Sequence, residues 1–160
     1  MSKGNPAMIE ILPSFELIGL KLPHKTRNQD GQSNRDGGQL WQKFEQEQIA
    51  SQIPQKFNED IYAVYFDYEG DHSDPFSYFV GCRVAPGSTL PDGLDRLIIP
   101  AQTYQKLKAE GPMPDCIAEL WKEIWKSDLP RAYIVDFEIY GEKSKNWNHA
   151  EIDVFLSITT

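Results

Sequence analysis

The run RAYIVDFEIY, Arg131–Tyr140, is rich in β-branched and aromatic residues and carries two carboxylates in its middle. This composition is typical of a buried β-strand. Side chains alternate across a strand, so one predicted face presents core residues only, namely Tyr133, Val135, Phe137 and Ile139. The other predicted face holds Ile134, Asp136, Glu138 and Tyr140. A carboxylate on a central strand is costly to desolvate unless donors or a cation meet it. Glu138 therefore points to a cationic ligand in an aromatic pocket.

The composition is that of a folded globular protein. The chain has 160 residues, 40% hydrophobic and 25% charged, which suits one domain or two small repeats sharing a core. The net charge of -8 argues against direct nucleic-acid binding and favours cationic partners. No apolar run approaches the roughly 20 residues that span a bilayer, and the N-terminus lacks a signal pattern. We therefore expect a cytoplasmic protein without membrane attachment.

Periodicity and turn residues on both sides of the run predict the remaining elements. A flexible start at residues 1–6 precedes a strand over 7–22 that is interrupted at Pro13, and the polar segment 23–38 is expected to be a mobile loop and a plausible lid. Then follow a helix over 39–53, a hairpin of strands 61–69 and 76–84, a strand region 94–109 broken at Pro100, a helix over 116–126 with Asp115 as its N-cap, and strands 131–140 and 150–159.

The element order is strand, helix, strand, strand, and then the same again. It predicts an α+β fold of duplicated strand-helix-strand-strand units with pseudo-twofold symmetry, a mostly antiparallel sheet and two helices. The units are expected at about 7–85 and 94–159, within a single domain over 1–160. A cleft where two such units meet is a favoured ligand site.

Several motifs together resemble the GyrI-like family. They are the aromatic hairpin Tyr62–Tyr68 with Tyr78–Gly81, the run Trp121–Trp125, and Asp136–Tyr140 followed by Glu151–Phe155. The family comprises effector-binding domains at the C-termini of AraC-type and MerR-type transcription activators, as well as free-standing proteins. The resemblance covers the chain from its first strand to its end. Because the sequence shows no helix-turn-helix region, it is similar to the free-standing members, and direct transcriptional activation is not expected.

The resemblance implies a pocket for lipophilic, often cationic small molecules. The family's pocket-floor glutamate corresponds to Glu138, and its neighbouring aromatic residue to Tyr140. The candidate ligand-binding residues are Glu138, Tyr140, Tyr65, Trp125, Trp121, Tyr104 and Tyr78.

Each candidate also has a plainer interpretation. Glu138 could be satisfied by a neighbouring Arg, Lys or tyrosine hydroxyl, or be exposed on an open sheet face. Asp136 is expected to be solvated or paired with Arg131. Two tryptophans one helical turn apart are more often core than pocket, although one of them could reach the cleft.

No catalytic, metal-binding or cofactor-binding motif is present. The histidines fall in predicted loops without shared spacing, and both cysteines, Cys82 and Cys116, are expected to be small core residues. Binding of a hydrophobic cation is the first hypothesis. A hydrolase that uses Glu138 as a general base on reactive small molecules is the second. A protein–protein inhibitor of the gyrase-inhibitor type, with a protein partner, is the third.

Overall fold

The structure is a computed structural model that describes residues 8–159. The predicted flexible start at 1–6 and the first residue of the predicted strand 7–22 lie outside this range. The strands are β1 (Met8–Leu12), β2 (Phe15–Lys21), β3 (Ile61–Phe66), β4 (Ser77–Val84), β5 (Asp95–Ile99), β6 (Gln102–Gly111), β7 (Arg131–Tyr140) and β8 (Ala150–Ile158). The helices are α1 (Gln32–Gln46), α2 (Ile49–Gln52) and α3 (Asp115–Lys126), with a short 3-10 turn, η1 (Glu142–Ser144), before β8.

The strands form one antiparallel sheet in the order β1-β6-β8-β7-β3-β4-β2-β5. This order is symmetric about the central β3/β7 pair, because β2-α1-β3-β4 on one side repeats as β6-α3-β7-β8 on the other. The short strands β1 and β5, each of which precedes a repeat, are exchanged between the two halves. The predicted α+β fold with duplicated units and pseudo-twofold symmetry is confirmed. The unit boundaries at about 7–85 and 94–159 stay a prediction.

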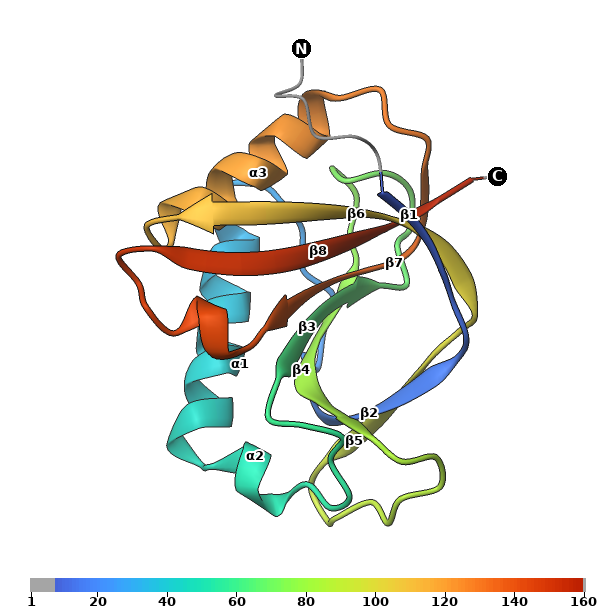
Figure 1. The fold of residues 1–160 in the computed structure, drawn as a ribbon, viewed down its shortest axis with the longest axis vertical. Coiled ribbons are helices and arrows are strands. Elements are labelled where there is room, and N and C mark those ends of the chain that lie inside the picture. Colours follow the sequence, from blue (N-terminus) through green and yellow to red (C-terminus); the bar gives the residue numbers. More distant parts are fainter. Residues whose placement is uncertain (1–7, 160) are drawn as a thin grey trace.

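The two long helices cover one face of the sheet (Figure 1). α1 packs on the β2–β4 half through Leu40 and Phe44, and α3 packs on the β6/β8 half through Trp121 and Ile124. At the centre of this face, Tyr65 of β3 and Tyr140 of β7 pack against both groups. The centre of the sheet, between the helices, is therefore the place where a pocket can form.

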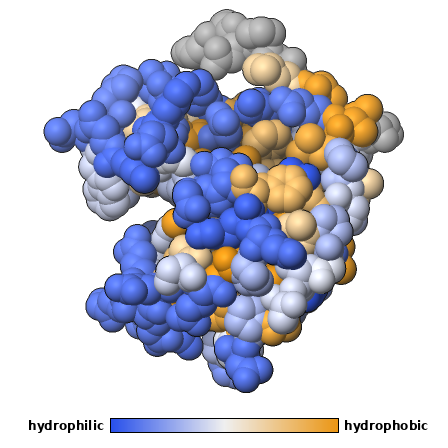
Figure 2. Space-filling view, turned by 60° about the horizontal axis from the view of Figure 1, so that its bottom comes forward, coloured by the Kyte–Doolittle hydropathy of each residue, from blue (hydrophilic) through white to orange (hydrophobic). Residues whose placement is uncertain are grey.

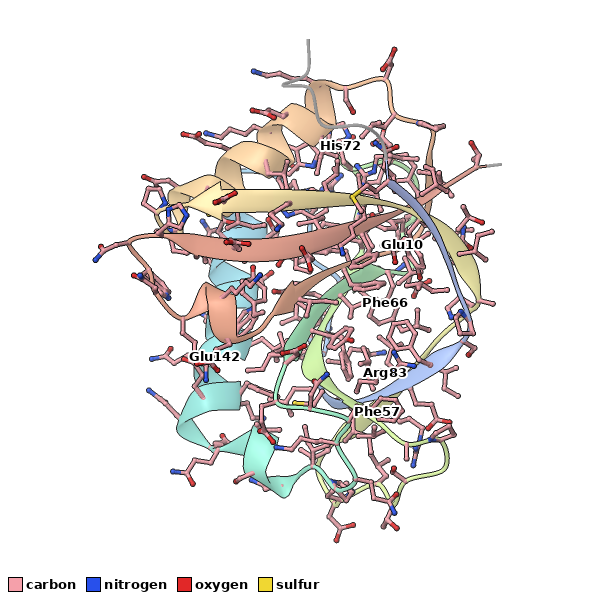
Figure 3. The ribbon with its side chains drawn as sticks, viewed as in Figure 1. Glu10, Phe57, Phe66, His72, Arg83 and Glu142 are labelled. Carbon is pink, nitrogen blue, oxygen red and sulfur yellow. The ribbon has the colours of Figure 1, made fainter. Side chains whose placement is uncertain are left out.

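The other face of the sheet curves around an aromatic core (Figure 3). The rings of Phe137 and Phe155 stack there with centroids 4.8 Å apart. Arg83 lies over the rings of Phe15 and Phe57 at 4.8 Å and 4.7 Å from their centroids. This core packs against one face of the central strands β3 and β7. The side chains on their other face are directed toward the helices.

The first helix differs from the prediction. It spans Gln32–Gln46 instead of 39–53, and Gln48, with a left-handed φ of 50°, separates it from the additional helix α2. The sequence predicted a loop at the first turns of this helix because they contain two adjacent glycines, Gly37 and Gly38, and glycine is a poor helix former. The first of them, Gly37, permits close packing: a Cβ there would lie 3.3 Å from the Tyr78 ring.

The helix predicted over 116–126 is confirmed, although its N-cap position is occupied by Pro114 and Asp115 is its first helical residue. Pro13 and Pro100 each divide a predicted long strand into two strands that pair separately. The hairpin β3/β4 is confirmed. Cys82 is buried in the core as predicted, whereas Cys116 is only half-buried.

β7 is irregular near its start. Tyr133 has a φ of 55°, and the register against β8 shifts between Arg131 and Asp136. In a regular strand these two residues, five positions apart, would face opposite sides; the irregularity brings both to one side. The Tyr133 ring also lies on that side, 5.6 Å from the Tyr68 ring and 4.3 Å from the Arg131 guanidinium. The prediction that Tyr133 faces the core is therefore wrong.

Two glycines, Gly19 of β2 and Gly81 of β4, lie opposite each other in the antiparallel pairing of these strands. In this pair, a Cβ on Gly19 would lie 2.0 Å from the Val80 carbonyl oxygen and 2.5 Å from the Cα of Gly81. We expect Gly19→Ala to destabilise the protein by about 1–3 kcal/mol, since the backbone must move. Urea unfolding measures this. Gly38→Ala is the control: nothing lies within 4 Å of a Cβ there, so stability should rise by about 0.5–1 kcal/mol. Equal effects of the two changes would contradict the close approach of β2 and β4 at this glycine pair.

The surface is mixed. Figure 2 shows a face with a notch between two hydrophilic lobes and with hydrophobic side chains exposed along the opposite side. Exposed large hydrophobic residues include Ile9 and Ile11 on the edge strand β1, and Ile98 on the edge strand β5. Among residues 8–159, no helix is long and apolar enough to cross a membrane.

Candidate functional site

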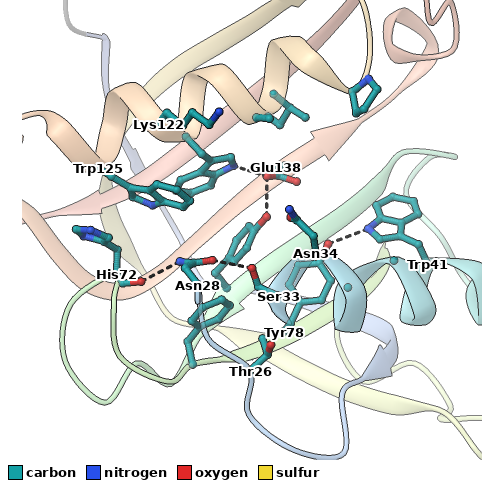
Figure 4. A pocket seen from close by; sticks show the side chains of 18 of the residues that line it. Thr26, Asn28, Ser33, Asn34, Trp41, His72, Tyr78, Lys122, Trp125 and Glu138 are labelled. Carbon is teal, nitrogen blue, oxygen red and sulfur yellow. Dashed lines mark hydrogen bonds between the residues drawn. The ribbon is translucent and has the colours of Figure 1, made fainter. Parts of the chain in front are cut away.

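A pocket of about 590 Å³ lies between α1 and α3, against the central strands of the sheet (Figure 4). α1 contributes Gly37 and Trp41, and α3 contributes Trp121 and Trp125. β3, β4 and β7 supply the floor, and the irregular segment between β2 and α1 supplies polar side chains at one side. The pocket therefore forms where the two repeated units meet, as the sequence predicted.

Glu138 is the only carboxylate of the described chain that lines this pocket, and its side chain is buried at 2% exposure. Three neutral donors bind it. Tyr65 Oη and Trp121 Nε1 donate to Oε2 at 2.9 Å and 2.6 Å, and Tyr140 Oη donates to Oε1 at 2.7 Å. The donors come from β3, α3 and β7, so both units contribute to holding the carboxylate in one position.

Burial and hydrogen bonding act on the pKa of Glu138 in opposite directions. Desolvation raises the pKa above the ordinary value of 4.5, while the bonds from Tyr140, Trp121 and Tyr65 lower it, and burial outweighs them. The pKa values of both tyrosines lie well above 10, through desolvation first and the neighbouring Glu138 second. At neutral pH both hydroxyls therefore keep their protons and act as donors.

This raised pKa predicts how the stability of the unliganded protein changes with pH. Below the ordinary pKa of 4.5, Glu138 is protonated in the folded and unfolded states alike. As the pH rises through the folded-state pKa, the unfolded state ionises first, so folding loses stability. We expect the unfolding free energy of Glu138→Gln, relative to wild type, to increase between mildly acidic and neutral pH, because the variant lacks the ionisable group. Urea unfolding across this range measures it; parallel curves would contradict the raised pKa.

Asp136, two residues earlier on β7, provides the contrast. Its carboxylate is fully buried and accepts hydrogen bonds from Arg131 Nη2 at 2.7 Å and from Tyr68 Oη at 2.6 Å. The backbone N–H of Ser157 donates to its other oxygen at 2.9 Å. Of the two expected environments of Asp136, exposure to solvent or an ion pair with Arg131, the structure shows the ion pair. Among residues 8–159, Glu138 has no such ion pair.

Aromatic rings surround the Glu138 carboxylate. The Tyr65 ring lies 5.0 Å from Trp121 and 5.1 Å from Tyr78, and the Trp41 ring lies 5.1 Å from Tyr140. Trp41 Nε1 donates to Tyr78 Oη at 2.8 Å, which links α1 to β4. These contacts hold the aromatic rings in defined orientations around the carboxylate, and the pocket between them stays open.

A hydrogen-bonded chain joins the segment between β2 and α1 to the β3–β4 turn (Figure 4). Ser33 Oγ donates to Asn28 Oδ1, and Asn28 Nδ2 donates to the His72 carbonyl oxygen, both at 2.8 Å. The His72 ring stacks on Trp125, with centroids 5.7 Å apart and planes within 10°. Residues 32–38 of the predicted lid are helical; the lid function of the rest of that segment stays a prediction.

Six of the seven predicted site residues line the pocket: Glu138, Tyr140, Tyr65, Trp125, Trp121 and Tyr78. Tyr104 does not, so its prediction is wrong. Its side chain is fully buried on the opposite face of the sheet, 5.2 Å from the Phe137 ring. Both tryptophans of α3, Trp121 and Trp125, line the pocket, whereas the sequence had left open which of the two would face it. The lining residues that sequence reasoning missed include Thr26, Gly37, Trp41, His72 and Arg131.

One exposed group outside the pocket has the composition of a metal site. Ligand atoms of Glu110, His149 and Glu151 lie within 4.8 Å of one another. His149 Nε2 is 3.0 Å from Glu110, and Lys108 Nζ is 3.0 Å from Glu151. Contacts within the chain, with Lys108 on Glu151 and His149 on Glu110, thus account for this group.

A buried carboxylate held by neutral donors, inside an aromatic pocket between two repeated units, defines a small-molecule-binding protein. The chain belongs to the Cass2 family of integron-associated effector binding proteins, which matches residues 8–158. The resemblance to GyrI-like effector-binding proteins is thereby confirmed.

Two curated relatives are named as regulators. The putative transcriptional regulator protein YobU of Bacillus subtilis is 25% identical over 74% of this chain and 77% of its own length. The transcriptional regulator BrlR of Pseudomonas aeruginosa is 29% identical over 91% of this chain. The match spans only 53% of BrlR, so this chain corresponds to about half of that protein.

Solved structures share the fold. An integron cassette protein from Vibrio cholerae, VCH_CASS2, superposes with a TM-score of 0.72 at 24% identity, covering 96% of this chain and 95% of its own. SAV2435, solved bound to tetraphenylphosphonium, superposes with a TM-score of 0.77 at 16% identity, covering 97% and 94% of the two chains.

Proposed function

We propose that the pocket binds a lipophilic organic cation and that Glu138 balances its charge. One observation carries this proposal: the buried Glu138 carboxylate has three neutral donors but, among residues 8–159, no cation. A buried charge without a counter-charge is costly, and two positions away the same strand gives Asp136 an arginine. A ligand cation at Glu138 would supply the missing charge.

The pocket walls support a ligand that is both cationic and apolar. Ring faces attract cations, by about 0.5–2 kcal/mol each, and they also bury apolar surface. A volume of about 590 Å³ is that of a drug-sized site. The net charge of -8 favours the approach of cations over anions.

The comparisons support the same ligand class. SAV2435 shares this fold and was solved with a lipophilic cation, tetraphenylphosphonium. YobU and BrlR are named as transcriptional regulators. We therefore propose that the bound cation acts as an effector and that its binding is coupled to transcriptional control.

Two ions of matched shape test the charge preference. Tetraphenylphosphonium and tetraphenylborate present the same phenyl surface with opposite charge. We expect calorimetry at neutral pH to show binding of the phosphonium and none of the borate. Several tryptophan rings line the pocket, so fluorescence gives an independent signal. Equal affinity for the two ions would overturn the proposed role of Glu138.

Cation binding should weaken in acid. The cation favours ionised Glu138, so a proton competes with it once the pH falls below the raised pKa of this residue. Affinity for tetraphenylphosphonium should then fall by at most tenfold per pH unit. Tyr140→Phe removes a bond that lowers the pKa, so the pH at which affinity begins to fall should move upward. Calorimetry from mildly acidic to neutral pH measures both curves; the opposite displacement in Tyr140→Phe would contradict the account.

A further inference from the structure

Arg131 lines the pocket, and two of its side-chain nitrogens have no hydrogen-bond partner among residues 8–159. Its side chain is 4% exposed, and Nη2 donates to Asp136 Oδ2 at 2.7 Å. Within residues 8–159, neither Nε nor Nη1 has a hydrogen-bond partner, although both atoms are buried. Buried donors are nearly always paired, and an unpaired one costs about 1–3 kcal/mol. An arginine with two free nitrogens beside a cavity is therefore unusual.

Thr26 gives a second, independent observation. It is 2% exposed, lines the same pocket, and its Oγ1 is buried without a partner among the described residues. Its backbone is fixed, because Thr26 and Phe76 exchange two N–H···O bonds of 2.9 Å. Figure 4 shows Thr26 across the pocket from Glu138. The Thr26 backbone is thus held in place, and its hydroxyl has no hydrogen-bond partner among residues 8–159.

Aromatic contacts connect these two residues. Tyr68 shares the Asp136 Oδ2 acceptor with Arg131, and its ring lies 5.7 Å from the Phe76 ring. Phe76 is in turn the backbone partner of Thr26. We call Arg131 and Thr26 the donor wall. Tyr68 and Phe76 also line the pocket, so the surface between the two donors belongs to the cavity.

Ring stacking does not account for the free nitrogens. The Arg131 guanidinium lies 4.3 Å from the Tyr133 ring centroid and 5.8 Å from that of Trp121. Such contacts use the faces of the guanidinium, whereas its N–H groups point outward in its plane. In addition, Tyr133 has a positive φ in the irregular stretch of β7 that brings Arg131 to this side. Non-glycine residues with this backbone conformation often mark functional sites.

We propose that the donor wall binds a hydrogen-bond-accepting oxygen of the ligand. The ligand class is then a lipophilic cation that also carries an ester, amide or ether oxygen, with the cation at Glu138 and the oxygen at the donor wall. The oxygen is uncharged, because Asp136 already balances Arg131. This inference rests on the proposed cation site and specifies which cations that site selects.

Two phosphonium probes test it. The first is a triphenylphosphonium that carries an ethyl butanoate chain, and the second carries a heptyl chain of the same length without oxygens. The measured quantity is the ratio of their dissociation constants, which cancels effects common to both. We expect this ratio to shift against the ester by about three- to tenfold in Thr26→Val and in Arg131→Lys, the value of one lost hydrogen bond. Lysine keeps a positive charge for Asp136, and valine keeps the shape of threonine.

The variants separate the possible outcomes. Thr26→Val should fold as wild type, since the lost hydroxyl has no partner in the described chain; thermal melting checks both variants. A shifted ratio in either variant supports the donor wall and assigns the contact to that residue. A ratio unchanged in both, with heptyl probe binding retained, overturns the donor wall and leaves the cation site intact. Glu138→Gln should weaken both probes equally. If neither probe binds wild type, the proposed function fails, and this inference fails with it.

Discussion

Replacing Glu138 by glutamine is expected to weaken tetraphenylphosphonium binding by about 2–5 kcal/mol, which is about 30-fold or more. Glutamine keeps the size of the side chain but removes the negative charge, and among residues 8–159 no other carboxylate lines the pocket. The donors Tyr65, Trp121 and Tyr140 stay in place, so the loss reports the charge rather than the shape of the site. Calorimetry on both proteins at neutral pH measures the difference.

Tyr104→Phe is the matched control for this experiment. Tyr104 lies on the opposite face of the sheet, and its hydroxyl has no partner in the described chain. Its removal should leave cation affinity unchanged within about twofold, since the residue touches the core only. Equal affinity of wild type and Glu138→Gln would contradict the charge-balancing role, and so would an equal loss in Tyr104→Phe.

The largest loss of stability is expected from Asp136→Asn. This change leaves the buried Arg131 guanidinium without its counter-charge, which costs about 3–5 kcal/mol. Tyr68 and the backbone of Ser157, which also bind this carboxylate, lose the favourable bond to a charged acceptor. Urea unfolding at neutral pH measures the difference in free energy.

A surface pair provides the comparison. Lys108 and Glu151 are 3.0 Å apart with side chains 47% and 27% exposed, so Glu151→Gln should cost only about 0–1 kcal/mol. The double variant Arg131→Met/Asp136→Leu should recover much of the loss caused by Asp136→Asn, because an apolar pair removes both buried charges. A loss from Asp136→Asn as small as that from Glu151→Gln would show that the buried pair does not support the fold.

The sequence was most informative where side chains alternate along one strand. The alternation of β7 placed Glu138 and Tyr140 opposite the core residue Phe137, and the structure shows this arrangement. The same rule failed at Tyr133, because alternation assumes a regular strand and the irregularity before Asp136 inverts the faces. Nothing in the local composition marks that irregularity, since Tyr133 is not a glycine.

Tyr104 shows a different limit. Its strand, β6, reads QTYQKLKAEG, in which polar residues occupy both faces, so alternation alone does not show on which side of the sheet Tyr104 lies. The structure places Tyr104 in the aromatic core because β6 curves over Phe137 and Phe155. In such a strand, the face that is buried is decided by packing against residues distant in sequence, here Phe137 and Phe155.

The pocket residues that sequence reasoning missed come from several separate elements and turns. His72 lies in the β3–β4 turn and reaches the pocket only because that turn approaches Trp125 of α3. Trp41 was assigned to a helix, but its contact with Tyr78 depends on how α1 packs on β4. Arg131 was considered only as a partner of Asp136. Each of these positions depends on tertiary packing, which local periodicity does not encode.

The pKa of Glu138 in the free and the tetraphenylphosphonium-saturated protein tests the central claim most directly. The carboxyl carbon resonance of isotopically labelled glutamate, assigned through Glu138→Gln, reports it by NMR titration. We predict a pKa above the ordinary 4.5 in the free protein, raised by burial, and a lower pKa once the bound cation stabilises the ionised carboxylate. The same pKa in both states would show that the ligand does not balance the charge of Glu138.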